Sequence, residues 1–190
     1  MNYIDYKPSH KNDIFVELND NEYQEAMDFG SELYKHSQKC NLRDHRTFVR
    51  NGVNGERVQQ LGALAESAVS KALGVRWLKG VDTFKKEDLP HNIEVRLIGK
   101  ENYGLRVYDR DDDSRRVVGI VIEKGQERKP YRIAGWINAK YAKKDIYKID
   151  PLNRGRPVFA VPQEKLFHMN ELKGLIEKEI AEANRSNPET

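Results

Sequence analysis

The chain has 190 residues, of which 38% are hydrophobic and 33% are charged, and its formal net charge is +3. This length favours a single domain, 1–190, and the near balance of basic and acidic residues permits nucleic-acid binding without requiring it. A single cysteine, Cys40, excludes an internal disulfide framework and argues against a zinc-finger site. Residues 1–20 contain no apolar signal-peptide region, and no stretch approaches the roughly 18 apolar residues of a membrane span. We therefore expect a cytoplasmic protein without a membrane partner.

The first part of the chain is predicted to be mainly helical. A short strand is expected over 13–18, and Asn19 then precedes a helix over 22–37. We interpret 1–55 as an N-terminal helical extension of a core that spans 56–184. The inner face of the first helix is expected to hold Met27, Leu33 and Tyr34.

A second helix is expected over 56–73, where apolar residues recur at helical spacing, and Gly74 should end it as a left-handed C-cap. Glu66 lies in the middle of this helix. A solvated glutamate on the outer face is the ordinary interpretation. However, small neighbours would let the helix approach a sheet closely, namely Gly62, Ala63, Ala65 and Ala68.

The hydrophobic period then changes to two, which predicts strands. Over 92–97, apolar and polar residues alternate, and the strand expected over 103–108 should pair with it as a hairpin. The remaining elements, in chain order, are a solvated charged turn over 109–114, strands over 117–122 and 131–137, a helix over 163–184 and a frayed tail over 185–190. This order favours a mixed α/β (α+β) fold, a central mixed sheet flanked by helices.

Two carboxylates and one arginine surround the first of these strands. Asp88 precedes Pro90, which cannot continue a sheet ladder, so Asp88 is expected in a loop or at a strand end. Glu94 and Arg96 are two residues apart, so their side chains should leave the same face of the strand. Mg²⁺ prefers oxygen ligands and usually rests on one or two carboxylates. A metal beside a fixed cation suits phosphodiester hydrolysis.

These residues resemble the PD-(D/E)XK nuclease superfamily, and more widely a group of uncharacterised phage-type proteins. The resemblance covers about 62–172, and its motifs are Gly62 to Glu66, Asp88 with Glu94 to Arg96, Gly135 to Ile137, and Val161 to Leu166. It implies a restriction-endonuclease-like core in which the helix bearing Glu66 covers the polar face of the strand. It also implies a Mg²⁺ or Mn²⁺ site made by Glu66, Asp88 and Glu94, with DNA as the partner, in a bacterial or phage-infected cell.

Arg96 stands where most of the superfamily has lysine, although arginine is usual in the phage-type group. Arginine stays protonated, so it can hold a phosphate oxygen but cannot act as a general base. Two roles remain open: Arg96 stabilises the transition state while the metal alone activates water, or the site binds nucleic acid without cutting it. Lys71 and Lys100 are alternative sources of a lysine, and His91 is a further candidate for substrate contact.

A basic run interleaved with aromatic residues follows the strand expected at 131–137. Such a run suits phosphate contacts and base stacking, although a solvated basic face is the simpler interpretation. The run consists of Lys140, Tyr141, Lys143, Lys144, Tyr147 and Lys148. The sequence thus leaves three functions to compare: a metal-dependent DNA nuclease, a catalytically silent nuclease-fold module that binds nucleic acid or protein, and a structural or inhibitory protein with incidental carboxylates.

Overall fold

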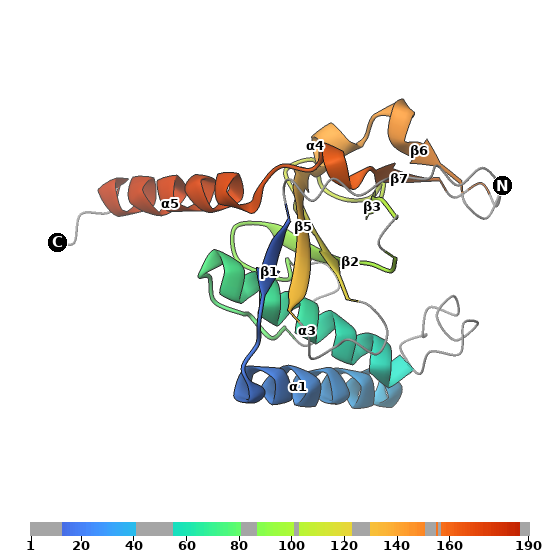
Figure 1. Ribbon diagram of the computed structural model, residues 1–190, viewed down its shortest axis with the longest axis vertical. Helices are drawn as coiled ribbons and strands as arrows, with labels where there is room; N and C mark the ends of the chain where they lie inside the picture. Colours follow the sequence, from blue (N-terminus) through green and yellow to red (C-terminus); the bar gives the residue numbers. More distant parts are fainter. Residues whose placement is uncertain are drawn as a thin grey trace.

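The computed structural model describes residues 13–40, 55–80, 87–100, 103–122, 130–150, 155 and 157–186. Two helices, a four-stranded sheet and a three-stranded sheet follow one another as layers (Figure 1). This arrangement confirms the predicted mixed α/β class, with a mixed sheet flanked by helices. Within the described ranges, every helix is too short or too polar to cross a membrane.

The four-stranded sheet has the order β1-β5-β4-β2. β1 (Ile14–Val16) and β4 (Arg116–Val121) both pair antiparallel with β5 (Tyr131–Asn138), whereas β2 (Ile93–Ile98) pairs parallel with β4. β2 is therefore an edge strand, and one side of its backbone is left for partners outside the sheet. The segment expected as an N-terminal extension contributes β1 to this sheet.

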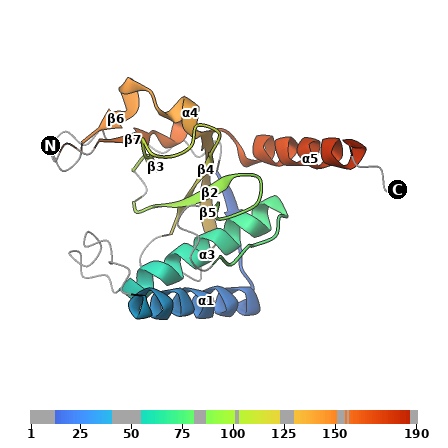
Figure 2. The same ribbon diagram turned by 180° about the vertical axis from the view of Figure 1, so that it is seen from behind.

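Helices α1 (Asp20–Lys39) and α3 (Gly55–Leu73) cover one face of this sheet, with α3 nearer to the strands (Figures 1 and 2). The predicted N-cap of α1 is confirmed, because the Asn19 side chain accepts from the Glu22 amide in a capping box. Gly74 has φ +68°, as expected of a left-handed C-cap after α3.

The inner face of α1 agrees with the prediction only in part. Met27 and Leu33 are partly buried and pack against the main core, and Tyr34 is partly buried, but the fully buried positions are Ala26 and Phe29. The reason is the close approach of the two helices at Gly30, where an added Cβ would lie 2.6 Å from the Gln60 nitrogen. Because only small residues fit at this contact, larger apolar side chains lie on its flanks.

The other face of the four-stranded sheet is covered by a second sheet, ordered β3-β7-β6. β3 (Leu105–Val107) and β6 (Lys148–Ile149) both pair antiparallel with β7 (Val158–Val161). The predicted hairpin between 92–97 and 103–108 is therefore wrong. Leu105 and Val107 are fully buried between the two sheets, so the chain leaves the first sheet after β2 and buries these residues in the second apolar cluster.

The expected helix over 163–184 begins later than predicted. A short 3-10 turn, η3 (Gln163–Lys165), is followed by extended chain, and α5 (Met169–Ser186) starts beyond it. Phe167 makes a backbone bridge to Trp136, and Gly135, with φ +128°, allows this close approach. α5 then projects away from the body (Figures 1 and 2). Of the predicted frayed tail, 187–190 lies outside the described residues.

Candidate functional site

Glu66 is held on the inner side of α3, where it lies against the segment that follows the helix. Its Oε2 accepts a hydrogen bond of 3.0 Å from the indole Nε1 of Trp77. Glu66 is only partly exposed and is bonded to Trp77, so the ordinary interpretation of a solvated outer-face glutamate is wrong. Burial, followed by the negative charge of Asp88, raises the pKa of Glu66 to about 8 despite the bond from Trp77. Glu66 is thus a protonated carboxyl group near neutral pH.

Asp88 lies beside the free edge of β2, in the turn that precedes the strand. Its Oδ2 accepts from the Val95 amide at 2.8 Å, and its own amide donates to the Ile93 carbonyl at 3.0 Å. The side chain therefore satisfies a strand amide that has no partner strand on that side. Burial, followed by the charge of Glu94, raises the pKa of Asp88 to about 6. Asp88 is the middle member of the three predicted carboxylates. Its charge raises the pKa of Glu66, and the charge of Glu94 raises the pKa of Asp88.

Glu94 and Arg96 share one face of β2, as predicted, but that face is not covered by α3. Ile93 and Val95 pack in the core cluster beneath the helices, whereas Ile98 packs between the two sheets. Because alternate strand residues face opposite sides, Glu94 and Arg96 lie on the side of the second sheet. The implied arrangement, with the Glu66-bearing helix over this face, is therefore wrong.

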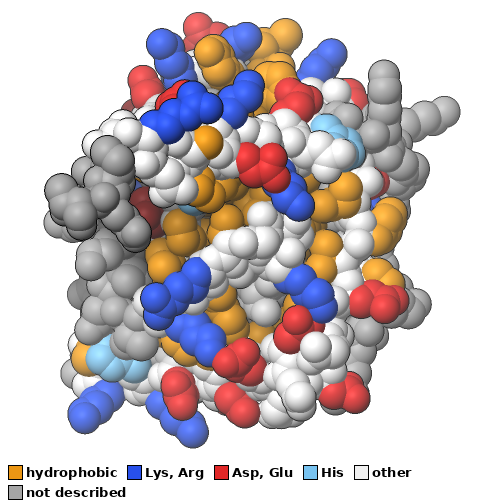
Figure 3. All heavy atoms as spheres, turned by 90° about the vertical axis from the view of Figure 1, so that its left-hand side faces the viewer, with side chains coloured by type: hydrophobic (Ala, Val, Ile, Leu, Met, Phe, Trp, Pro, Cys, Tyr) orange, Lys and Arg blue, Asp and Glu red, His pale blue; other side chains and the backbone are white. Residues whose placement is uncertain are grey.

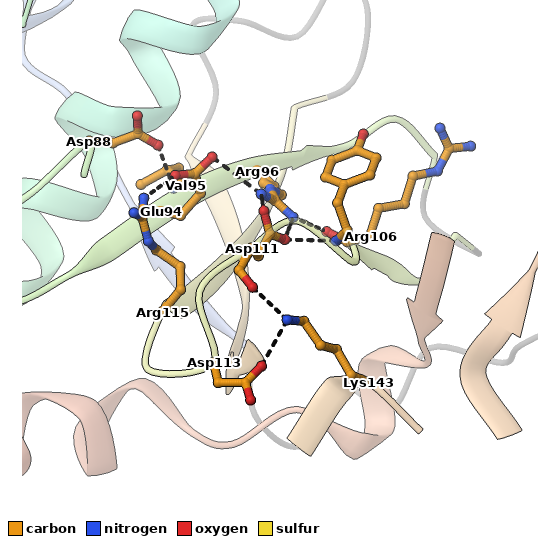
Figure 4. Close-up of polar contacts among 10 residues, drawn as sticks. Asp88, Glu94, Val95, Arg96, Arg106, Asp111, Asp113, Arg115 and Lys143 are labelled. Carbon is orange, nitrogen blue, oxygen red and sulfur yellow. Dashed lines mark hydrogen bonds and ion pairs between the residues drawn. The ribbon is translucent and has the colours of Figure 1, made fainter. Parts of the chain in front are cut away.

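The guanidinium of Arg96 is held from several directions (Figure 4). It donates to both carboxylate oxygens of Asp111, at 2.6 and 2.8 Å, and to the Arg106 carbonyl at 2.8 Å. A weaker contact of 3.3 Å reaches Glu94, and the Tyr108 ring centre lies 4.7 Å from the guanidinium carbon. The bidentate pair with Asp111, together with these further contacts, fixes the position of the Arg96 guanidinium group.

Glu94 accepts from two arginines. Its Oε1 faces Arg96, and its Oε2 accepts from Arg115 at 2.8 Å. The side chains of all three residues are at most one-quarter exposed, so Glu94 lies in a covered ionic cluster rather than on an open sheet face. This cluster places two positive charges directly beside the carboxylates of the loop and strand.

The prediction that 109–114 is a solvated turn is only partly right, because Asp111 is covered. Its side chain is only 9% exposed, whereas that of Asp113 is 65% exposed. Burial opposes ionisation, but hydrogen bonds from Arg96 and the Tyr108 amide hold the pKa of Asp111 below its ordinary value. The turn thus covers the polar face of β2 through ion pairs, and only part of the turn is solvated.

Sequence reasoning missed three residues of this site: Trp77, Asp111 and Arg115. Trp77 had a usable signal, since a buried indole requires an acceptor for its N–H. Asp111 and Arg115 had none, because their neighbours in the sequence are equally charged and nothing local distinguishes the buried members.

The other predicted contributors lie elsewhere. Lys71 pairs with Glu22 at 2.6 Å, and Lys100 lies 5.5 Å from the Tyr103 ring centre. His91 contacts Glu179 of α5, with 3.0 Å between Nδ1 and Oε2. None of these contacts supplies a lysine or histidine to the carboxylates, so the positive charge beside Glu94 comes from arginines.

A hard divalent cation needs several oxygen ligands that converge on one point. Among the described residues, no group of three or more His, Cys, Asp or Glu side chains is arranged to hold a metal ion. The chemistry of Glu66 and Asp88 nevertheless fits one, because both are oxygen donors whose pKa values are raised partly by neighbouring negative charge. Mg²⁺ commonly uses only one or two carboxylates and completes its shell with water and phosphate.

Comparisons with known proteins found no match among protein-family models, curated proteins or solved structures.

Proposed function

We propose that the protein is a metal-dependent nuclease that hydrolyses phosphodiester bonds of DNA. The supporting observation is that Glu66 on α3, Asp88 before β2 and Glu94 on β2 lie close enough to affect one another's pKa values. Glu94 also pairs with Arg96 and Arg115. Strongly perturbed pKa values in such a cluster are typical of functional sites. Mg²⁺ or Mn²⁺ would be held by Asp88 and Glu66, where it would supply Lewis-acid chemistry to a phosphate and its attacking water.

The residues of the chain have separate roles in this proposal. Asp88, with a pKa of about 6, is ionised near neutral pH and is placed to accept a proton or hold a cation. Glu66 retains its proton until a cation or higher pH removes it. Arg96 and Arg115 stay charged, so they stabilise negative charge that develops on the phosphate and cannot act as bases.

The direct test is cleavage of single- and double-stranded DNA by the wild type with Mg²⁺ or Mn²⁺. Asp88→Asn keeps an acceptor for the Val95 amide but removes the charge, so it should lower the rate by about 10²–10³, the scale of losing one charge-stabilising group. Asp113→Asn is the matched control, because its side chain is largely exposed. Uncut substrate with the wild type in both metals would refute the nuclease.

Cation binding gives a second, activity-independent prediction. Mg²⁺ or Mn²⁺ should stabilise the wild type by mass action, by about 2.7 kcal/mol at a concentration 100 times the Kd, because the unfolded chain does not assemble the pair. Calorimetric or thermal melts near pH 8 measure this, and Asp88→Asn should lose most of the gain. An equal gain in wild type and Asp88→Asn would place the cation elsewhere.

One observation favours the second candidate, a module of this fold that binds nucleic acid without cutting it. Arg96 is committed to Asp111, and both oxygens of Glu94 face arginines. Substrate phosphate must compete with these ion pairs before either group can act. If the wild type binds DNA but cuts none, the ionic cluster is a structural device and the binding module is the better conclusion.

A further inference from the structure

The segment that follows β5 is exposed and basic, and here it is called the basic projection, residues 139–149. It consists of α4 (Ala139–Ala142), η2 (Asp145–Tyr147) and β6, and it forms the uppermost part of the molecule in Figure 1. Its exposed lysines are Lys140, Lys144 and Lys148. Along the top of the molecule in Figure 3, basic, acidic and hydrophobic side chains intermix.

Apolar side chains stand among these lysines. Ile146 is 82% exposed, the highest value among the exposed large hydrophobic residues described, and Tyr141 is 54% exposed. Single exposed apolar residues are ordinary on protein surfaces. Here, however, Ile146 lies at the tip of a hydrogen-bonded turn, in which the Tyr147 amide donates to the Lys144 carbonyl at 2.9 Å. The turn therefore presents an aliphatic side chain between lysines on an ordered backbone.

The basic projection is attached to the candidate site through one turn. The Ala139 amide donates to the Arg115 carbonyl at 2.8 Å, and the Lys143 ammonium donates to the Asp111 carbonyl at 2.5 Å (Figure 4). The side chains of the same turn hold the site arginine cluster, because Asp111 binds Arg96 and Arg115 binds Glu94. The projection and the ionic cluster are therefore joined by this one turn.

We infer that the basic projection is the surface that holds duplex DNA, with its lysines on phosphates and Ile146 inserted between base pairs in the minor groove. The choice of DNA rests on the proposed function. Lysines along a surface neutralise the phosphate backbone, and apolar wedges such as isoleucine unstack base steps and kink the duplex. An anionic membrane would satisfy the same positive charges, so binding to anionic vesicles is one of the outcomes that would overturn the inference.

The role of the three exposed lysines is tested by measuring the binding of duplex DNA in the absence of metal. Lys140→Ala, Lys144→Ala and Lys148→Ala are combined, and the control combines Lys35→Ala, Lys173→Ala and Lys178→Ala, which are exposed on α1 and α5. Affinity for duplex DNA is measured in EDTA across salt concentrations. Between about 50 and 200 mM salt, the wild type should lose about fortyfold more affinity than the projection variant, from a slope change of about 0.9 per lysine. The control should keep the wild-type slope.

The wedge is tested by DNA bending. Energy transfer between dyes at the two ends of a short duplex should rise when the wild type binds, because minor-groove wedges kink DNA by about 20–90°. Ile146→Ala should bind with little change of salt slope but without the full bend. Ile180→Ala, on exposed α5, is the matched control and should bend DNA as the wild type does.

The outcomes separate this inference from the nuclease proposal. Lysine-dependent binding and bending by a wild type that cuts no DNA would support the projection and refute the nuclease. A projection variant that binds duplex with wild-type affinity and salt slope would overturn the inference, even if the wild type cuts. Binding to phosphatidylserine-containing vesicles through the same lysines, with no binding to duplex, would also overturn it. If the duplex stays straight when the wild type binds, Ile146 does not insert between base pairs, and that part of the inference is refuted.

Discussion

Replacing Glu66 with glutamine is expected to stabilise the fold at alkaline pH and to abolish the proposed cleavage. The pKa of Glu66 rises from 4.5 to about 8 on folding, so the folded state binds the proton more tightly than the unfolded state does. Stability from this group is therefore fully present below pH 4.5 and is lost as pH rises toward 8. Glutamine resembles the protonated carboxyl group and keeps an acceptor for Trp77.

The free energy of unfolding of Glu66→Gln should exceed that of the wild type by about 2–4 kcal/mol near pH 9, after allowance for the partial exposure of the carboxylate. This difference should vanish near pH 4. Urea unfolding at several pH values measures it, with Glu32→Gln on the exposed side of α1 as control. A divalent cation should reduce the difference in free energy of unfolding between the Glu66→Gln variant and the wild type, because it stabilises only the wild type. A glutamine variant that is less stable than the wild type at pH 9 would show that the ionised carboxylate contributes to the fold.

Replacing Arg96 with alanine is expected to lower the free energy of unfolding by about 3–5 kcal/mol, because removal of one partner leaves a covered charge uncompensated. The side chain of Asp111 is only 9% exposed and receives two of the hydrogen bonds of Arg96. Loss of cleavage in this variant would therefore not by itself show a catalytic role.

A second substitution separates the two effects. Asp111→Asn in the Arg96→Ala background removes the uncompensated charge, so the pair should cost less than the sum of the single variants. Arg110→Ala is the control, because this exposed arginine also lies over the Tyr108 ring but acts on Asp111 through its charge, without the two hydrogen bonds that Arg96 donates. It should cost about 1 kcal/mol or less. A loss below about 1 kcal/mol for Arg96→Ala would contradict the structural role.

Local features of the sequence were predicted well because their causes lie within a few residues. The cap at Asn19 depends on Glu22 three residues later, and Gly74 ends α3 through its own backbone. The small residues of α3 were expected to permit close packing, and Ala63, Ala65 and Ala68 are indeed buried in the core. The start of α5 was not predicted, because the Phe167 bridge to Trp136 joins residues far apart in the chain.

The sequence by itself determined the mixed class, the loop position of Asp88 and the common face of Glu94 and Arg96. A period of two establishes that alternate residues share a face, whatever the strand pairs with. Only the tertiary structure decided which layer covers that face. β3 joined the second sheet instead of forming a hairpin with β2, and the turn carrying Asp111 and Arg115 then covered the polar side chains. Strand pairing and ion pairing depend on long-range burial, and a local pattern of polar and apolar residues does not encode the partner.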